Sequence, residues 1–423
     1  MVATAQTIGN GSGRVDSAYA WLRLAASVLL GTLGSVGLWS YVVALPFVQT
    51  DFAITRADAS LAYTLNMIGF GVGAVIIGSL VDRFGIVPPL TVSVLALAFG
   101  FVASGVASDF TVFAIANLVI GIGSSGAFAP LMADISHWFT RRRGIAVAVC
   151  SSGNYIGGAA WPPVVRYFIE TDGWRQSQVA IGAICLFTML PLLLLLRRRL
   201  DTHDEEDAGS SAAGAQASLG LNRYVLFALL SIAGVGCCVA MSMPQVHIVA
   251  YCSDLGYGVA RGAEMLSLML GFGVISRIGS GLVADRIGSL TTLLIGSVMQ
   301  ASALFLYLWF DGLTPLYVIS ALFGLFQGGI VPMYALIVRD YFPPRQAGTL
   351  VGLVVTATIA GMAIGGWMSG AIFDLTGSYW QAFANGFLWN LLNIVIVLYL
   401  LRRARAHRAE IESGGASAHA AVA

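Results

Sequence analysis

The chain has 423 residues, of which 57% are hydrophobic and only 10% carry a formal charge. Soluble domains carry about 25% charged residues, and the formal net charge here is only +1. These values argue against a soluble enzyme and a nucleic-acid-binding protein, and five cysteines argue against a disulfide scaffold. Because a membrane-spanning helix uses about 20 mostly apolar residues, the composition favours a polytopic helical membrane protein.

The chain opens with the polar stretch MVATAQTIGNGSGRVDSAYA, which lacks the features of a cleavable signal peptide, so we expect the first apolar segment to remain as a helix. Twelve apolar segments follow, at about 22–48, 59–81, 87–107, 111–135, 145–168, 177–196, 223–250, 262–284, 289–309, 313–338, 347–372 and 383–401. We therefore predict an all-α membrane protein with twelve transmembrane helices.

A charged stretch that becomes rich in Ala, Ser and Gly separates the sixth and seventh segments, and this composition is typical of a flexible linker. It predicts an amino-terminal six-helix bundle at 1–199, a cytoplasmic linker at 200–221, and a carboxy-terminal six-helix bundle with a cytoplasmic tail at 222–423.

All 22 basic residues are arginines, and the chain contains no lysine. Positive residues beside membrane spans are retained in the cytoplasm. With both termini cytoplasmic, 17 of the 22 arginines fall on the inner side. Four fall outside, at Arg56, Arg166, Arg175 and Arg261, and Arg277 alone falls inside an apolar segment.

The two halves repeat one another. The stretch from Gly78 to Gly85 reads G-x-x-x-D-R-x-G, and the same pattern recurs from Gly281 to Gly288, 203 positions later. Trp138-Phe139 returns as Tyr341-Phe342 with the same offset of 203. Duplicated six-helix halves are typical of transporters in which one half rocks against the other around a central site.

The repeated pattern predicts a conformational latch at the inner ends of the helices. Its glycines allow close helix approach, and its Asp and Arg side chains can make charge-assisted hydrogen bonds. The latch residues are Gly78, Asp82, Arg83, Gly281, Asp285 and Arg286. We expect Asp134 to join this latch through the arginines at 141–143.

The G-x-x-x-D-R-x-G pattern between the second and third segments, repeated between the eighth and ninth, resembles the signature loop of the major facilitator superfamily. That resemblance implies a fold of two pseudo-symmetric six-helix bundles. Three further stretches resemble the monocarboxylate transporter and oxalate:formate antiporter branch. They run from Trp138 to Gly158, from Pro244 to Gly256 and from Ser276 to Arg286.

Arg277 is the first candidate for a substrate-binding residue. It precedes Asp285 by eight residues, or about 12 Å along a helix, which places it near the centre of a hydrocarbon core about 30 Å thick. A buried arginine remains charged, and its planar guanidinium fits a carboxylate. The eleventh segment contains no second cation from Leu350 to Phe373, and charge balance therefore favours a monocarboxylate. The alternative role is a structural arginine that donates to backbone carbonyls.

Several polar and aromatic residues could line the cavity around that arginine. The candidates are Tyr41, Phe128, Asn154, Gln327 and Tyr334. Animal monocarboxylate carriers resemble this chain but have a lysine late in helix 1 and an Asp at the position of Gly273. Their proton relay therefore does not transfer to this chain. His247 and Asp254 are the remaining candidates for proton coupling, since histidine titrates near neutral pH.

We therefore expect a secondary active transporter of small monocarboxylates of lactate or pyruvate size, working by proton symport and alternating access. The alternatives are an organic-anion exchanger, an exporter of an amphipathic compound, and a non-transporting membrane sensor. We expect a monomer in a bacterial inner membrane whose partners are a monocarboxylate anion, a proton and the lipid bilayer. We expect no nucleic-acid partner, no enzyme activity, no metal and no cofactor.

Overall fold

The structure is a computed structural model that describes residues 15–140, 142–198 and 220–420, without the side chains at 143, 344–348 and 408–420. The described chain is almost entirely helical. The helices are α1 (Ala18–Gly34), α2 (Val36–Asp51), α3 (Arg56–Phe84), α4 (Val87–Gly105), α5 (Phe110–Ser125), α6 (Ala129–Trp138), α7 (Arg143–Leu193), η1 (Leu194–Leu196), α9 (Arg223–Asp254), α10 (Gly258–Ile287), α11 (Ser289–Trp309), α12 (Leu313–Gln327), α13 (Ile330–Tyr341), α14 (Pro344–Thr376) and α15 (Tyr379–Ala420).

These helices make twelve membrane crossings. Eleven stretches of the described residues are long and apolar enough to cross a bilayer, and three of them join two helices each: α1 with α2, α5 with α6, and α12 with α13. The stretch that contains α7 makes two crossings, because Gly173 breaks the helix with φ 82° and ψ 160°. The prediction of twelve transmembrane helices is confirmed. Most of the predicted linker at 200–221 lies outside the described residues.

The repeated sequence pattern has a direct local consequence for helices α3 and α10. Each helix ends at the last glycine of the pattern, Gly85 with φ 76° and Gly288 with φ 85°. Only glycine adopts such a positive φ without strain. The two halves therefore turn their chains at equivalent places, which supports the duplication.

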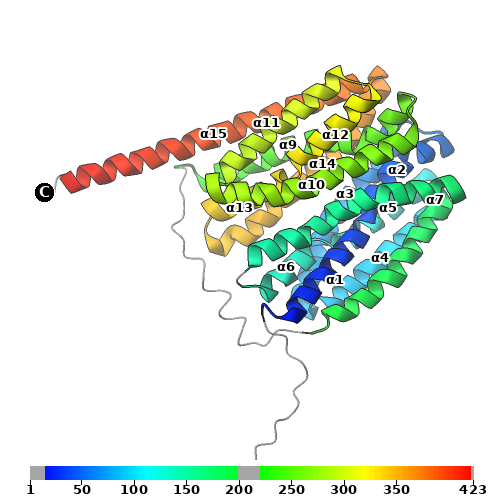
Figure 1. The fold of residues 1–423 in the computed structure, drawn as a ribbon, viewed down its shortest axis with the longest axis horizontal. Coiled ribbons are helices and arrows are strands. Elements are labelled where there is room, and N and C mark those ends of the chain that lie inside the picture. The colour runs from blue at the N-terminus through cyan, green and yellow to red at the C-terminus, as the bar shows by residue number, and fades with distance from the viewer. Residues whose placement is uncertain (1–14, 141, 199–219, 421–423) are drawn as a thin grey trace, which may run out of the picture.

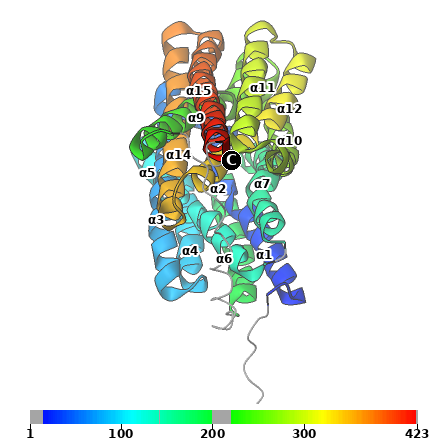
Figure 2. The ribbon, with the colours of Figure 1, turned by 90° about the vertical axis from the view of Figure 1, so that its left-hand side faces the viewer.

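The two halves lie side by side, with their helices roughly parallel (Figures 1 and 2). The amino-terminal half contains α1–α7 and the carboxy-terminal half contains α9–α15. We call the side where α1 begins and α15 ends the termini side, and the other side the opposite side. The main contacts between the halves run along α3 against α14 and α7 against α10.

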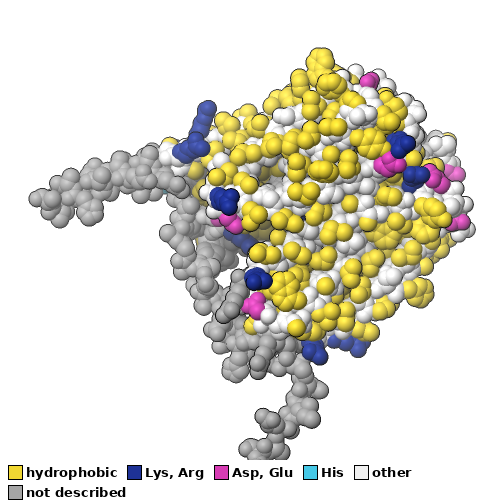
Figure 3. All heavy atoms as spheres, in the orientation of Figure 1, with side chains coloured by type: hydrophobic (Ala, Val, Ile, Leu, Met, Phe, Trp, Pro, Cys, Tyr) yellow, Lys and Arg dark blue, Asp and Glu magenta, His cyan; other side chains and the backbone are white. Residues whose placement is uncertain are grey.

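The outer surface of the bundle suits a lipid environment. Large apolar side chains face outward from both halves, among them Phe99, Phe187 and Leu282. On the face shown in Figure 3, hydrophobic side chains cover a broad band, and charged side chains gather toward its two ends. Such a band between two charged rims is what a bilayer core requires.

Candidate functional site

The Arg277 side chain lies between the two halves and is only 8% exposed. Its Nε donates to the Gly328 carbonyl at 3.3 Å, and its Nη1 donates to the Ser151 carbonyl at 3.1 Å. Its guanidinium lies over the Tyr155 ring, 4.5 Å from the centroid. No carboxylate among residues 15–140, 142–198 and 220–420 pairs with it.

The break between α12 and α13 supplies one of these carbonyls. Gly328 and Gly329 interrupt the tenth crossing, and the last carbonyls of a helix have no partner within it. Gly329 N also donates to Ser276 Oγ at 3.0 Å, which fixes the break against α10. A guanidinium has five N–H donors. The Gly328 and Ser151 carbonyls accept from Arg277, and the Tyr155 side chain is a further hydrogen-bond partner of its guanidinium. The donors that remain are those that a ligand would bind.

Gln327 is 1% exposed and immediately precedes the carbonyl that Arg277 binds. Neither its amide nitrogen nor its amide oxygen has a hydrogen-bond partner in the described structure. An unsatisfied buried amide is unfavourable by about 1–3 kcal/mol, so a polar ligand beside Arg277 would relieve it. Asn154 is adjacent to Tyr155 on α7 and is half-buried. Asn154 and Gln327 thus belong to α7 and α12, two helices that pack on α10, but no contact of their side chains with Arg277 is recorded among the described residues.

Tyr41, Phe128 and Tyr334 lie differently from this expectation. Tyr41 is 2% exposed and donates to the Ala59 carbonyl within the amino-terminal half. Tyr334 is fully buried and donates to Asn393 Oδ1 at 2.8 Å within the carboxy-terminal half. Phe128 packs on Phe70, with ring centroids 6.0 Å apart. Their predicted contact with substrate gains no support from this conformation.

Arg56 joins the two halves on the opposite side. Its Nη1 and Nη2 donate to the two carboxylate oxygens of Asp254 at 3.0 and 3.3 Å. Nη1 also donates to the Tyr379 hydroxyl at 2.5 Å, and Nε donates to Gln49 Oε1 at 2.6 Å. The Phe373 ring lies 4.7 Å from the guanidinium. An arginine predicted only as a topology signal therefore forms the principal ion pair between the halves.

Asp374 adds a second link at the same place. Its two carboxylate oxygens accept from the backbone N–H groups of Arg56 at 3.0 Å and Ala57 at 2.6 Å. A carboxylate at a helix amino terminus satisfies free donors and complements the helix dipole. Farther along this interface, Arg166 and Glu264 approach to 3.8 Å. The halves are closed against each other on the opposite side.

His247 and Asp254 are connected, but not directly as expected. The structure pairs Asp254 with Arg56, whereas His247 Nδ1 lies 3.1 Å from the Tyr379 hydroxyl and Nε2 lies 2.8 Å from the Gly366 carbonyl. Asp254 makes no recorded contact with His247, because Arg56 binds its carboxylate. Tyr379 bridges the two sites, since its hydroxyl contacts both Arg56 and His247.

The charged residues of the predicted latch lie on the termini side. Asp82, Arg83, Asp285 and Arg286 are exposed, and within the described part of the chain none makes an ion pair or hydrogen bond. A β-carbon added at either of the two predicted latch glycines would meet no atom within 4 Å. In this conformation, those glycines do not mediate close helix approach. Within the described residues, the ion pairs that join the two halves, Arg56 with Asp254 and Arg166 with Glu264, lie on the opposite side.

Asp134 forms an ion pair with the buried Arg23 side chain. Its carboxylate accepts from Arg23 Nε at 2.6 Å and Nη2 at 2.7 Å, and the Arg23 guanidinium lies 4.5 Å from the Trp138 ring centroid. Arg23 also donates to the Leu196 carbonyl. Arg23 is the partner of Asp134 among the described side chains. The side chains of Arg141 and Arg143 lie outside the described residues, so pairing of Asp134 with the arginines at 141–143 stays a prediction.

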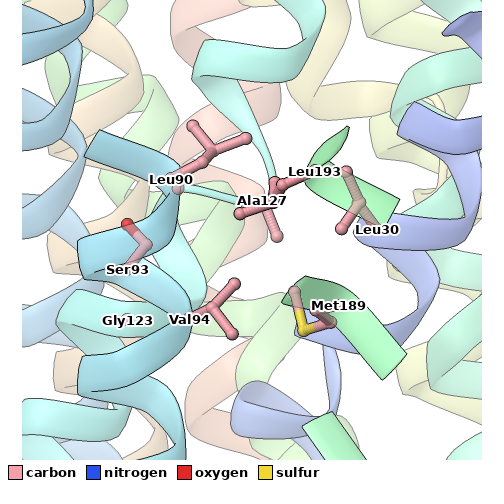
Figure 4. A pocket seen from close by; sticks show the side chains of 9 residues that line it. Leu30, Leu90, Ser93, Val94, Gly123, Ala127, Met189 and Leu193 are labelled. Carbon is pink, nitrogen blue, oxygen red and sulfur yellow. The ribbon is translucent and has the colours of Figure 1, made fainter. Parts of the chain in front are cut away.

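A small apolar pocket lies within the amino-terminal half (Figure 4). Its lining residues come from α1, α4, α5 and α7 and include Leu30, Val94 and Met189, together with Gly123 of α5 and Gly126 between α5 and α6. It does not reach the interface between the halves, and it lacks a charged side chain. It is packing space within one bundle.

Known proteins share this architecture over the whole chain. The sequence profile of the Major Facilitator Superfamily matches residues 27–315 and 265–422. The chain belongs to the major facilitator superfamily. A crystal structure of a bacterial homologue of the human lysosomal transporter Spinster, inward-facing and occupied, superposes with a TM-score of 0.68 at 15% identity. The match covers 92% of this chain and 96% of that one, and it confirms the fold of two six-helix bundles.

The relatives from this superfamily are transporters. This chain is likewise a transporter and not an enzyme. The MFS-type transporter pynF of Aspergillus niger is 23% identical over 87% of this chain and 84% of its own length. Monocarboxylate transporter 13 of Bos taurus is 24% identical over 90% of each chain. These relatives support the predicted branch of the superfamily. Because they are eukaryotic, they give no support to the expected bacterial source.

Sequence reasoning did not identify four residues that the structure makes prominent. Tyr155, Arg56, Asp374 and Tyr379 all contact a predicted site residue or join the halves. Only a weak signal in the sequence pointed to these residues. Arg56, Asp374 and Tyr379 lie at helix ends, where a charged or aromatic residue is common beside a membrane.

Proposed function

We propose that this superfamily member transports a small monocarboxylate, with Arg277 as the group that binds the carboxylate. The observation that carries this proposal is the environment of Arg277, which holds a buried permanent cation between the halves with only carbonyls and an aromatic ring as partners. An arginine near the centre of a bilayer is unfavourable by about 2.5 to more than 10 kcal/mol. An anionic ligand offsets part of that energy.

Charge balance supports one carboxylate rather than two. The described residues place no second cation beside Arg277, and the eleventh crossing contributes none from Leu350 to Phe373. A guanidinium binds one carboxylate through two parallel hydrogen bonds. Gln327 would bind a hydroxyl or carbonyl beside that carboxylate, since both of its amide atoms are otherwise unpartnered. Lactate and pyruvate carry such a second polar group.

Alternating access would reach this site from each side in turn. In the conformation described here the opposite side is closed by the contacts of Arg56, Asp254 and Asp374. We infer that proton coupling acts through His247 and Asp254, because both are linked to the closing contacts through Tyr379 and Arg56. A proton on Asp254 would weaken its ion pair with Arg56. Proton binding would thereby favour opening of the opposite side.

We infer that the termini side faces the cytoplasm, because 17 of the 22 arginines belong to it by the predicted topology. The opposite side then faces outward, and its opening would admit a proton and substrate together. The membrane in which the protein resides, and its action as a monomer, are likewise proposals.

Uptake into proteoliposomes tests the proposal. Radiolabelled lactate and pyruvate are supplied with and without an inward proton gradient, and Arg277→Gln is the test variant. We expect gradient-stimulated uptake by the native protein and none by the variant. Full-rate uptake by Arg277→Gln would remove the assignment of the carboxylate site. Uptake that requires a preloaded internal anion would favour exchange, and transport only in the outward direction would favour export.

A further inference from the structure

The ring beneath Arg277 suggests a role for a residue outside the predicted set. We propose that Tyr155 is a positioning residue that orients the Arg277 guanidinium for the carboxylate, and that Gly273 provides the space for its ring. The inference rests on the proposed function of Arg277 as the carboxylate-binding group.

All contacts of the Arg277 guanidinium with the amino-terminal half involve α7. Nη1 donates to the Ser151 carbonyl, and the guanidinium lies over the Tyr155 ring at 4.5 Å. Residues four apart in a helix lie on one face, one turn apart. One face of α7 therefore contacts the Arg277 guanidinium twice, at its edge through the Ser151 carbonyl and on its plane through the Tyr155 ring. With Nε fixed on Gly328, the orientation of the guanidinium plane is determined.

Gly273 lies one turn before Arg277 on α10. A β-carbon at this position would lie 2.4 Å from both Cδ1 and Cε1 of Tyr155, which is far too close. The next nearest atom is the Gly324 carbonyl oxygen at 3.7 Å, an ordinary contact distance. The Tyr155 ring alone therefore excludes a side chain at 273. The glycine and the tyrosine form a matched pair across the two halves.

An aromatic ring is well suited to orienting the Arg277 guanidinium. Its face attracts a cation without neutralising it. A carboxylate in the same place would occupy the guanidinium and compete with the substrate. The ring comes from the amino-terminal half and the arginine from the carboxy-terminal half, so the oriented cation exists only while α7 and α10 are packed together.

Substrate kinetics test the pair in the full-length protein in proteoliposomes. Tyr155→Leu should raise KM about tenfold with little change in maximal rate, because it removes the attraction for the cation. Tyr155→Phe keeps the ring and removes the hydroxyl that hydrogen-bonds with Arg277, so its KM should rise less than that of Tyr155→Leu. Tyr167→Leu is the matched control, since Tyr167 is on the same helix and 64% exposed.

The glycine has its own test and control. Gly273→Ala should raise KM as Tyr155→Leu does, because the added methyl displaces the ring. Gly271→Ala is the matched control on the same helix, because its added methyl would also meet α7 but at an ordinary distance, 3.7 Å from the Ala159 methyl. A native KM in Tyr155→Leu or in Gly273→Ala would overturn the inference.

Thermal unfolding without substrate separates this inference from the proposed function. We compare Tyr155→Leu, Arg277→Gln and the double variant with the native protein in detergent. If the ring holds the guanidinium, the melting temperature of the double variant falls by less than the sum of the decreases in the two single variants. Additive shifts would overturn the inference whatever the substrate is. Non-additive shifts without monocarboxylate uptake would retain the pairing and overturn the proposed substrate.

Discussion

Arg56→Gln should open the opposite side of the protein. In the native chain, Arg56 donates to both carboxylate oxygens of Asp254 and to the Tyr379 hydroxyl, and all three contacts cross between the halves. Glutamine is too short and carries no charge, so these contacts are lost. The bond between Arg56 and Gln49 lies within one half and does not hold the halves together.

The free energy lost in Arg56→Gln depends on how exposed Arg56 and Asp254 are. The Arg56 side chain is 8% exposed and the Asp254 side chain is 35% exposed. Hydrogen bonds to charged groups contribute about 1.5–3 kcal/mol each, but partial exposure of the carboxylate weakens them. We take about 2–3 kcal/mol for the contacts across the halves together, and this corresponds to about a 30- to 150-fold change in the ratio of closed to open states.

Distances between spin labels measure that ratio. Ser108 lies between α4 and α5, and Asp311 lies between α11 and α12, so both are exposed residues on the opposite side of different halves. Cysteines introduced there can be labelled selectively because all five native cysteines are buried. Double electron–electron resonance should show one short distance in the native protein and an added longer distance in Arg56→Gln.

Arg261→Gln is the matched control, since this arginine is on the same side but pairs with Glu264 within its own half. It should leave the distance distribution unchanged. The charge-exchanged double variant Arg56→Asp with Asp254→Arg should recover part of the short distance. An unchanged distribution in Arg56→Gln would refute the role of Arg56 in closing the halves.

Three other outcomes are expected. Asp374→Ala removes the cap that the carboxy-terminal half places on the amino terminus of α3, an interaction of about 1–2 kcal/mol. The same pair of spin labels should therefore show partial opening of the opposite side. If the distances do not change, contacts other than this cap keep the halves closed. Asp134→Ala leaves the buried Arg23 guanidinium unpaired, and a loss of about 3–5 kcal/mol should lower the melting temperature in detergent clearly; an unchanged value would contradict a structural role for that pair. His247→Gln should abolish stimulation of uptake by a proton gradient and preserve exchange of labelled for unlabelled substrate; retained stimulation would exclude His247 from coupling.

Residue patterns along the chain predicted the number of crossings, the duplication of the halves and the isolation of Arg277. These features depend on local properties. The length of an apolar segment fixes whether it spans a bilayer, and a shared offset of 203 fixes the repeat. Helix ends were less well predicted. The segment predicted at 59–81 extends to Arg56–Phe84, because polar residues at a membrane surface continue a helix that hydropathy no longer marks.

Residue patterns do not predict which side chains from different helices contact one another. Pairing of Arg23 with Asp134, of Arg56 with Asp254, and of Arg277 with Tyr155 joins residues more than 100 positions apart. Such contacts depend on how each helix is rotated about its axis and which neighbour it packs against. In a helix that is apolar on nearly every face, hydrophobic periodicity does not report that rotation. The sequence therefore locates the central cation, and the packing of α7 on α10 decides what holds it.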